Sequence, residues 1–262
     1  MNLITLVENT SCREDLPAEH GLSLYVETGN RKLLFDSGQT GLVVENARRL
    51  GVDLSAVDTV ILSHGHYDHG GGLFAFLEVN KTAPIYASDL CFGSFYHGTR
   101  KYIGLNPLLQ DCRRFRPVSE ITDLGDGLTL TPGRMVLTPE SIPYQGLNVK
   151  HKSLYCPDCF LHEQYLTLEE NGKKILFSGC SHRGIVNIAR HFQPDILIGG
   201  FHFKALDPQK DRGTLEHAAK ALLDLPTRYY TCHCTGEAQY AILKELMEDR
   251  ISYLSTGTCL TL

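Results

Sequence analysis

The sequence predicts an α/β fold in which two similar halves of strands and helices form one domain of four layers. Apolar runs of strand length follow one another between turn residues, and longer helical segments alternate with them. The pair Asn171-Gly172, with a strand pattern on each side, is a strong hairpin signal. The 262 residues contain no internal repeat, no low-complexity stretch and no Pro/Ser-rich linker, so residues 1–262 are expected to be a single domain.

The first half is expected to open with meandering hairpins and to continue with helices between strands. A polar loop, 9–21, separates its first two strands, a Gly-Asn turn precedes the third, Asp36-Ser37-Gly38 ends the third, and Gly51 stops its first helix. The predicted strands are 4–7, 22–27, 32–35, 57–62 and 83–87, and the predicted helices are 43–50 and one that begins at Leu73.

The second half is expected to alternate strands with helices more regularly. Several of its strands end in Gly, Cys, Ser or His, which places polar side chains at strand ends. The predicted strands are 134–138, 166–170, 174–178, 195–200, 228–231 and 251–254, and the predicted helices are 185–191, 214–223 and 238–247.

Residues 88–130 are predicted to be an irregular insertion. The segment mixes Gly, Tyr, Arg and Pro and is too long for a plain connection, which is typical of a lid or a substrate wall. It carries two cationic clusters, Arg100–Tyr102 and Arg113–Arg116. These clusters could meet an anionic substrate or form a solvated surface.

Composition limits the function classes. The formal net charge is −5 and no basic run exists, which does not favour nucleic acid as a partner. No apolar run is long enough for a membrane span, and the N-terminus lacks the pattern of a signal peptide. Nine cysteines, an odd number, fit free thiols in a reducing cytoplasm. A small-molecule substrate is therefore expected, and the oligomeric state stays open.

The most informative stretch is Ser63-His64-Gly65-His66-Tyr67-Asp68-His69-Gly70-Gly71-Gly72. It follows a buried strand and precedes a helix, so its polar side chains lie on a turn at the C-terminal end of a strand, where open α/β sheets bind ligands. Neutral imidazoles bind Zn²⁺ and similar metals, and a carboxylate adds charge neutralisation. The stretch therefore predicts a metal site with His64, His66, Asp68 and His69 as ligands.

This stretch resembles the signature of the metallo-β-lactamase superfamily. The resemblance implies a four-layered αββα sandwich, usually two metal ions, and hydrolysis of esters, amides, thioesters or phosphodiesters. It also implies that Asp36, at the end of a strand, braces the metal loop, and that His233, after a late strand, is the final histidine ligand. The alternatives are a turn or capping aspartate and a structural core histidine.

Two positions depart from the superfamily pattern. Cys180 stands where an aspartate normally bridges the two ions, so a thiolate ligand is one reading and a small buried thiol is the other. His182, two residues later, is the preferred further ligand. Glu140 stands in a turn that often holds a histidine ligand, where it could be an oxygen ligand, a base, or a capping or ion-pairing residue.

Further segments resemble one branch of the superfamily, which contains proteins named for dihydropterin ribofuranosyl-aminobenzene phosphate synthase. By that resemblance His20 and His202 line the pocket. The segments are His20-Gly21-Leu22-Ser23, Phe177-Ser178-Gly179-Cys180-Ser181-His182-Arg183-Gly184-Ile185 and Gly199-Gly200-Phe201-His202.

A separate hypothesis concerns Cys156-Pro157-Asp158-Cys159. Together with Cys232 and Cys234 this pair could form a structural zinc site; a redox pair and ordinary free thiols are the alternatives.

The leading functional hypothesis is a hydrolase that uses metal-activated water at a dinuclear zinc site, with iron or manganese as other possible metals. His64, His66 and His182 would hold one ion, and Asp68, His69 and His233 the other, with Asp68 also steering a proton. The substrate is expected to be small and anionic or phosphorylated. The alternatives are a synthase or transferase acting on a dihydropterin and a phosphoribosyl-type substrate, and a non-catalytic ligand sensor.

Overall fold

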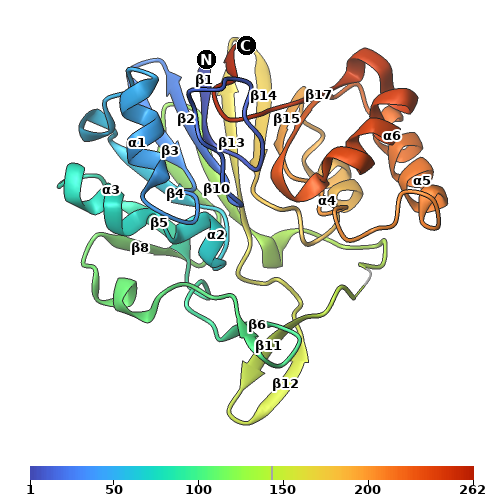
Figure 1. Cartoon of the computed structure of the whole chain (residues 1–262), viewed down its shortest axis with the longest axis horizontal. Coiled ribbons are helices and arrows are strands. Elements are labelled where there is room, and N and C mark those ends of the chain that lie inside the picture. The colour runs from blue at the N-terminus through green and yellow to red at the C-terminus, as the bar shows by residue number, and fades with distance from the viewer. Residues whose placement is uncertain (143) are drawn as a thin grey trace.

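A computed structural model of the chain describes residues 1–142 and 144–262. Two β-sheets pack face to face, and helices cover the outer face of each sheet (Figure 1). This arrangement confirms the predicted α/β sandwich of four layers. In the described part of the chain, none of the helices has both the length and the apolar character needed to cross a membrane.

The first sheet has seven strands in the order β18-β1-β2-β3-β4-β5-β8. Antiparallel hairpins join β1 to β2 and β2 to β3, as predicted from the turn residues, and β3, β4, β5 and β8 are parallel. The strands are β1 Asn2–Val7, β2 Ser23–Thr28, β3 Arg31–Phe35, β4 Thr59–Leu62, β5 Ile85–Ser88, β8 Phe115–Val118 and β18 Cys259–Thr261, and the helices beside them are α1 Leu42–Arg49, α2 Tyr67–Gly70 and α3 Leu73–Val79.

The second sheet also has seven strands, in the order β17-β16-β15-β14-β13-β10-β9. The hairpin β13–β14 turns at Asn171-Gly172 as predicted, and β14 to β17 are parallel. The strands are β9 Thr122–Gly125, β10 Leu128–Pro132, β13 Gln164–Glu170, β14 Lys173–Ser178, β15 Ile196–Gly199, β16 Arg228–Thr231 and β17 Ile251–Tyr253, and the helices are α4 Ile185–Phe192, α5 Arg212–Leu223 and α6 Glu237–Met247.

A third, small sheet lies at one end of the sandwich (Figure 1). Its strands are β6 Phe95–His97, β7 Lys101–Tyr102, β11 Leu147–His151 and β12 Leu154–Pro157. Residues 88–130 therefore contain more regular structure than their composition indicates, since they supply β6 and β7, the edge strand β8 and the edge hairpin that begins with β9.

The prediction of a strand at 134–138 is wrong. Residues Gly133–Met135 form a short 3₁₀ helix after β10, because Gly133 donates a backbone hydrogen bond to Glu163 and Val136 donates one back to Gly133. Val136 is buried but its neighbours Met135 and Leu137 are exposed, so the apolar run imitates a strand without forming one. The other short 3₁₀ helices are Leu54–Ala56, Pro107–Asp111, His233–Thr235 and Glu248–Arg250.

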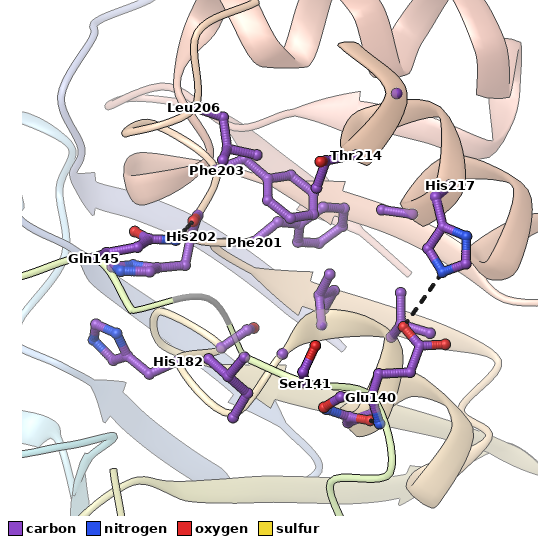
Figure 2. Close-up of a pocket in the computed structure, with 18 residues that line it drawn as sticks. Glu140, Ser141, Gln145, His182, Phe201, His202, Phe203, Leu206, Thr214 and His217 are labelled. Carbon is purple, nitrogen blue, oxygen red and sulfur yellow. Dashed lines mark hydrogen bonds and ion pairs between the residues drawn. The ribbon is translucent and has the colours of Figure 1, made fainter. Parts of the chain in front are cut away.

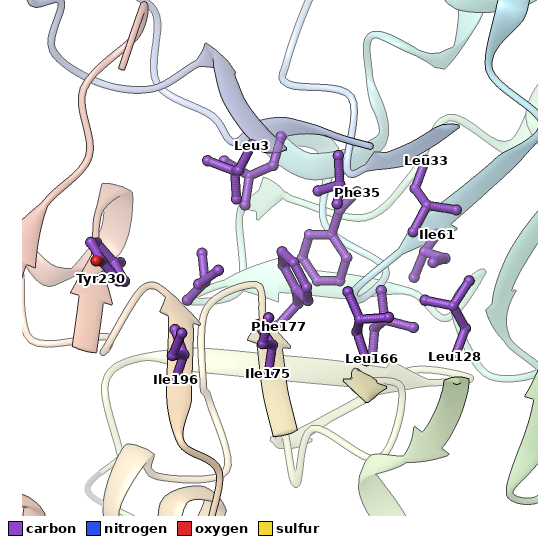
Figure 3. Packing of buried hydrophobic residues seen from close by; sticks show 14 of the residues in the cluster. Leu3, Leu33, Phe35, Ile61, Leu128, Leu166, Ile175, Phe177, Ile196 and Tyr230 are labelled. Atoms are coloured by element: carbon purple, nitrogen blue, oxygen red, sulfur yellow. The ribbon is translucent and has the colours of Figure 1, made fainter. Parts of the chain in front are cut away.

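The main core lies between the two large sheets (Figure 3). Phe35 of β3 and Phe177 of β14 meet there with ring centroids 5.6 Å apart, and both are fully buried. Burying one such side chain stabilises the fold by about 1.5–3 kcal/mol. Because both strands end directly after these rings, the core fixes the position of the loops that begin at Asp36 and Gly179.

Candidate metal centre

The predicted ligands come together because parallel strands present their C-terminal ends at one edge. β3 and β4 are parallel in the first sheet, and β14, β15 and β16 are parallel in the second. The face-to-face packing of the sheets then brings the two sets of strand ends together. Seven residues with possible metal-donor atoms are buried at this edge. They are His64, His66, Asp68, His69, Cys180, His182 and His233.

The first group of donor atoms is formed by His64, His66 and His182, whose ring nitrogens lie within 4.8 Å of one another. The Nε2 atoms of His64 and His182 are 3.3 Å apart. Nε2 of His66 is buried and has no hydrogen-bond partner among the described residues. An unpartnered buried nitrogen is costly, and a bound cation would satisfy it.

The second group surrounds Nε2 of His69. This atom lies 3.2 Å from Nε2 of His233, 3.2 Å from Sγ of Cys180 and 4.0 Å from Oδ2 of Asp68. Oδ2 of Asp68 is also 3.4 Å from Nε2 of His233. With zinc–nitrogen bonds of about 2.0–2.1 Å, two ligands in tetrahedral geometry are separated by about 3.3 Å. The observed spacings in both groups therefore fit a transition metal.

Neighbouring polar groups orient three of the imidazoles. His69 Nδ1 lies 2.7 Å from Asp36 Oδ2, and His64 Nδ1 lies 2.9 Å from Ser63 Oγ. His233 Nδ1 lies 2.9 Å from the side-chain oxygen of Asn9. These oxygens accept the Nδ1–H of each ring, so Nε2 keeps its lone pair for the shared centre, as in metal sites whose ligands are braced from behind. Asp36 is therefore the group that supports His69 from behind.

The protonation states suit a cation site. Burial holds the pKa of His64 and His182 well below the usual range and lowers the pKa of His66 to about 3, so these rings are neutral. Burial would lower the pKa of His69 as well, but the carboxylates of Asp36 and Asp68 outweigh it and raise that pKa to about 9. The second group therefore attracts positive charge, which a proton carries when no metal does.

The carboxylate of Asp68 and the thiol of Cys180 differ in how readily they ionise. Burial alone would raise the pKa of Asp68, but His69, His20 and His233 hold it well below its usual range, so Asp68 is a carboxylate. Burial raises the pKa of Cys180. The thiol therefore needs a bound cation before it ionises, as in other metal–thiolate sites.

Both donor groups open into one cavity of about 350 Å³. His20 lines it and approaches Asp68 with Nε2 3.1 Å from Oδ2, and His202 lines it as well. Two cations, Lys101 and Lys204, also line the cavity. Lys101 Nζ is 3.3 Å from the hydroxyl of Tyr67 and lies over its ring.

Two expectations place residues at the centre that the structure puts elsewhere. Glu140 forms ion pairs with Arg190 and His217, its backbone is held by Asn187 on α4, and it belongs to none of the donor groups found within residues 1–142 and 144–262. The segment Arg113–Arg116 does not line the cavity; Arg114 instead bonds backbone oxygens near Asn80.

The four-cysteine zinc site is wrong. Cys156 and Cys159 are exposed and line a separate cavity beside β12, whereas Cys232 and Cys234 are buried at the end of β16. In residues 1–142 and 144–262 all cysteines are free thiols. Cys234 instead joins Cys180 and His202 in a group of possible ligand atoms.

Several buried residues that hold the centre were missed from the sequence. Glu8, directly after β1, accepts a hydrogen bond from the backbone N–H of His233, whose φ is 52°. Glu163 accepts one from the backbone N–H of His182. His162 accepts one from the backbone N–H of Gly65 and contacts Asp158 with its other nitrogen. Two features of the sequence could have indicated these residues: the carboxylate of Glu8 at a strand end, and the four-residue spacing from Asp158 to His162.

Comparison with known proteins agrees with this geometry. The profile of the metallo-β-lactamase superfamily matches residues 16–141, which include the histidine-rich loop. The 7,8-dihydropterin-6-methyl-4-(β-D-ribofuranosyl)-aminobenzene-5'-phosphate synthase of Methanocaldococcus jannaschii is 28% identical, over 88% of this chain and 86% of that protein.

Solved structures extend the likeness over the whole chain. The crystal structure of Tm1679, a metal-dependent hydrolase of the β-lactamase superfamily, is 30% identical and superimposes with a TM-score of 0.84, covering 100% of this chain and 99% of the other. Zn²⁺-bound PqqB from Methylobacterium extorquens, 16% identical and covered over the full length of both chains, shares the fold with a TM-score of 0.62. The chain therefore belongs to the metallo-β-lactamase superfamily of metal-dependent enzymes.

Proposed function

We propose that this protein is a metal-dependent hydrolase that uses a metal-activated water at a dinuclear zinc centre to cleave a small anionic, phosphorylated substrate. One observation supports the proposal most directly. Two adjacent groups of metal donors open into the same cavity, whose wall also carries Lys101 and Lys204. Adjacent metal sites with an open cavity suit hydrolysis, and the lysines suit an anionic substrate.

In this proposal His64, His66 and His182 would hold one ion, and Asp68, His69 and His233 would hold the other, with Cys180 beside the second. When bound, such ions lower the pKa of water to about 7 and stabilise negative charge on the oxygen under attack. Beside its role as a ligand, the Asp68 carboxylate could accept a proton or a hydrogen bond from a water at the centre. His20 Nε2, 3.1 Å from Asp68, is half-exposed and connects this carboxylate with solvent for proton transfer.

The rim of the cavity supports recognition of an anion. Lys101 is held against Tyr67, 5.3 Å from its ring centroid, so its ammonium has a preferred position rather than a free one. Lys204 follows the strand end that carries His202. A phosphoryl group at the centre can therefore meet cationic side chains contributed by two different loops.

A second candidate function is a synthase or transferase that acts on a dihydropterin and a phosphoribosyl-type substrate. It is favoured by the 28% identity to the M. jannaschii synthase over 88% of the chain. The same donor groups and the same lysines would serve this reaction.

The test measures turnover by the zinc-loaded protein on phosphodiesters, thioesters and lactones, beside a dihydropterin with a phosphoribosyl acceptor. Hydrolysis of a phosphodiester supports the proposal, and turnover of only the pterin pair supports the synthase. Lys101→Ala should lower kcat/KM for the phosphodiester about tenfold or more by loss of a charge-assisted contact. Lys81→Ala should not, because Lys81 is exposed just after the C-terminal end of α3 and does not line the cavity. Tight binding without turnover of any substrate would contradict both enzymatic functions.

A further inference from the structure

A second cavity of about 660 Å³ adjoins the metal centre. It shares Gln145, His182 and His202 with the metal cavity, so the two spaces meet at a proposed metal ligand. In Figure 2 these three residues lie at one end of the cavity, and the ion pair between Glu140 and His217 lies at the other. A molecule that enters from the metal centre can therefore extend toward α5.

The wall between these ends is apolar and partly aromatic. Phe201 and Phe203 stand side by side along it, with ring centroids 6.2 Å apart and nearly perpendicular planes (Figure 2). Ile142, Ile185 and Leu206 complete the wall. Phe203 and Leu206 are only partly buried, so part of this apolar surface faces the empty space and gains from being covered.

The far end offers a fixed hydrogen-bond acceptor. The backbone of Glu140 both accepts from and donates to the side chain of Asn187, which holds the residue in place. One carboxylate oxygen pairs with Arg190, and the other lies 3.6 Å from Nε2 of His217, too far for a good hydrogen bond. That second oxygen can accept a hydrogen bond from an N–H group of a ligand.

We propose that this cavity is the subsite for a flat aromatic ring system with N–H donors, which belongs to the same substrate whose anionic group binds at the metal centre. The inference rests on the proposed function and names its substrate class: a phosphorylated compound with an aromatic or heteroaromatic part. The cavity volume lies within the range of about 300–1,000 Å³ typical of small-molecule sites. The aromatic wall contacts the ring faces, and Glu140 receives the N–H groups at the end.

The test uses two phosphonates, which resist hydrolysis and differ only in the ring: 1-naphthylmethylphosphonate and methylphosphonate. Their affinities for the zinc-loaded full-length protein are measured by calorimetry. Covering about 100 Å² of ring surface should make the naphthyl compound bind at least about tenfold more tightly.

Two variants test whether the tighter binding of the naphthyl compound arises in this cavity. A Cβ at Gly213, on the first turn of α5, meets no heavy atom within 4 Å, so Gly213→Phe can fill the cavity without disturbing the fold. Phe203→Ala removes part of the wall. Both variants should bring the ratio of the two affinities close to one, whereas Lys220→Phe, on an exposed face of the same helix, should keep the wild-type ratio. Thermal unfolding confirms that each variant is folded.

The outcomes separate this inference from the proposed function. If the wild-type protein binds both phosphonates equally, or if Gly213→Phe and Phe203→Ala both keep the preference, the subsite is refuted even where phosphodiesters are hydrolysed. If the preference exists and disappears in these variants while no phosphodiester is cleaved, the subsite stands and the hydrolase proposal fails.

Discussion

The brace behind His69 leads to a prediction that can be worked out quantitatively. The Asp36 carboxylate is fully buried and accepts three hydrogen bonds of 2.7 Å, from Ser63 N–H, from Ser63 Oγ–H and from His69 Nδ1–H. In Asp36→Asn one oxygen becomes an NH₂ group, which cannot accept the hydrogen of His69. The backbone should tolerate the change, because asparagine adopts the observed φ of 59° as readily as aspartate does.

Two effects of this substitution act on the metal at the second donor group. Loss of a bracing carboxylate costs about 10–100-fold in metal affinity, or about 1.4–2.7 kcal/mol. The second effect favours metal binding in the variant. Asp36 helps to raise the pKa of His69 to about 9, so in the wild type a proton competes with the metal at Nε2 below that pH, and the substitution weakens this competition. The wild-type affinity should therefore rise about tenfold per pH unit between pH 7 and 9, and the variant should lack most of this slope.

The assay is competition for zinc with a chelator of known affinity, measured from pH 7 to 9.5. Asp36→Asn should bind the second ion about 10–100-fold more weakly at pH 9.5, with a smaller difference at pH 7. Asp126→Asn is a matched control, because Asp126 also has a positive φ of 53° but lies on an exposed turn and pairs with Arg31. Wild-type affinity and an unchanged pH slope in Asp36→Asn would refute the role of the brace.

Three further outcomes follow from the same geometry. Gly65→Ala should lose metal and unfold at lower urea concentration, because its Cβ would overlap the carbonyl oxygen of Cys91; equal midpoints would contradict this contact. In the metal-free protein, His66 has a pKa of about 3 against 6.5 when unfolded, so it should contribute about 1.4 kcal/mol of lost stability per pH unit as the pH falls below 6.5; urea titrations of His66→Gln should therefore show a shallower fall than the wild type, and equal slopes would contradict it. Cys180→Asp should abolish the thiolate-to-metal charge-transfer band of the cobalt-substituted protein, and a wild-type spectrum would show that Cys180 is not a ligand.

Local patterns in the sequence were sufficient to predict most of the fold. Strands and helices were correctly placed wherever apolar periodicity and turn residues agreed, as at the Asn171-Gly172 hairpin. The strand predicted at 134–138 failed because exposed Met135 and Leu137 imitate the alternation of a strand. The tail strand β18 was missed, since three residues paired to β1 leave little local signal.

Part of the candidate site was proposed from local sequence and part from the resemblance. His64, His66, Asp68 and His69 form a metal-binding pattern within six positions, whereas Asp36 and His233 were implied by the resemblance to the superfamily. Other residues that support the site left no such indication. Glu8 follows β1 and accepts the backbone N–H of His233 after β16, so the packing of the two sheets brings this pair together. Glu163 precedes β13 and accepts the backbone N–H of His182 after β14, so the pairing of these two strands brings that pair together.

Glu140 shows the limit of prediction from position in a pattern. The turn that holds it corresponds to one that often carries a ligand, yet its backbone is hydrogen-bonded with Asn187 and its side chain pairs with Arg190 and His217. The distance between two loops depends on how each is anchored, and that information lies in contacts with α4 and α5 rather than in the loop itself.

The central claim is that imidazoles from the ends of different strands hold two metal ions side by side. It is tested most directly by the metal content of protein purified without oxygen, compared among the wild type, His66→Ala and His233→Ala. The account predicts about two ions per wild-type chain and about one in each variant. A wild-type chain without bound metal, or variants that both retain two ions, would contradict it.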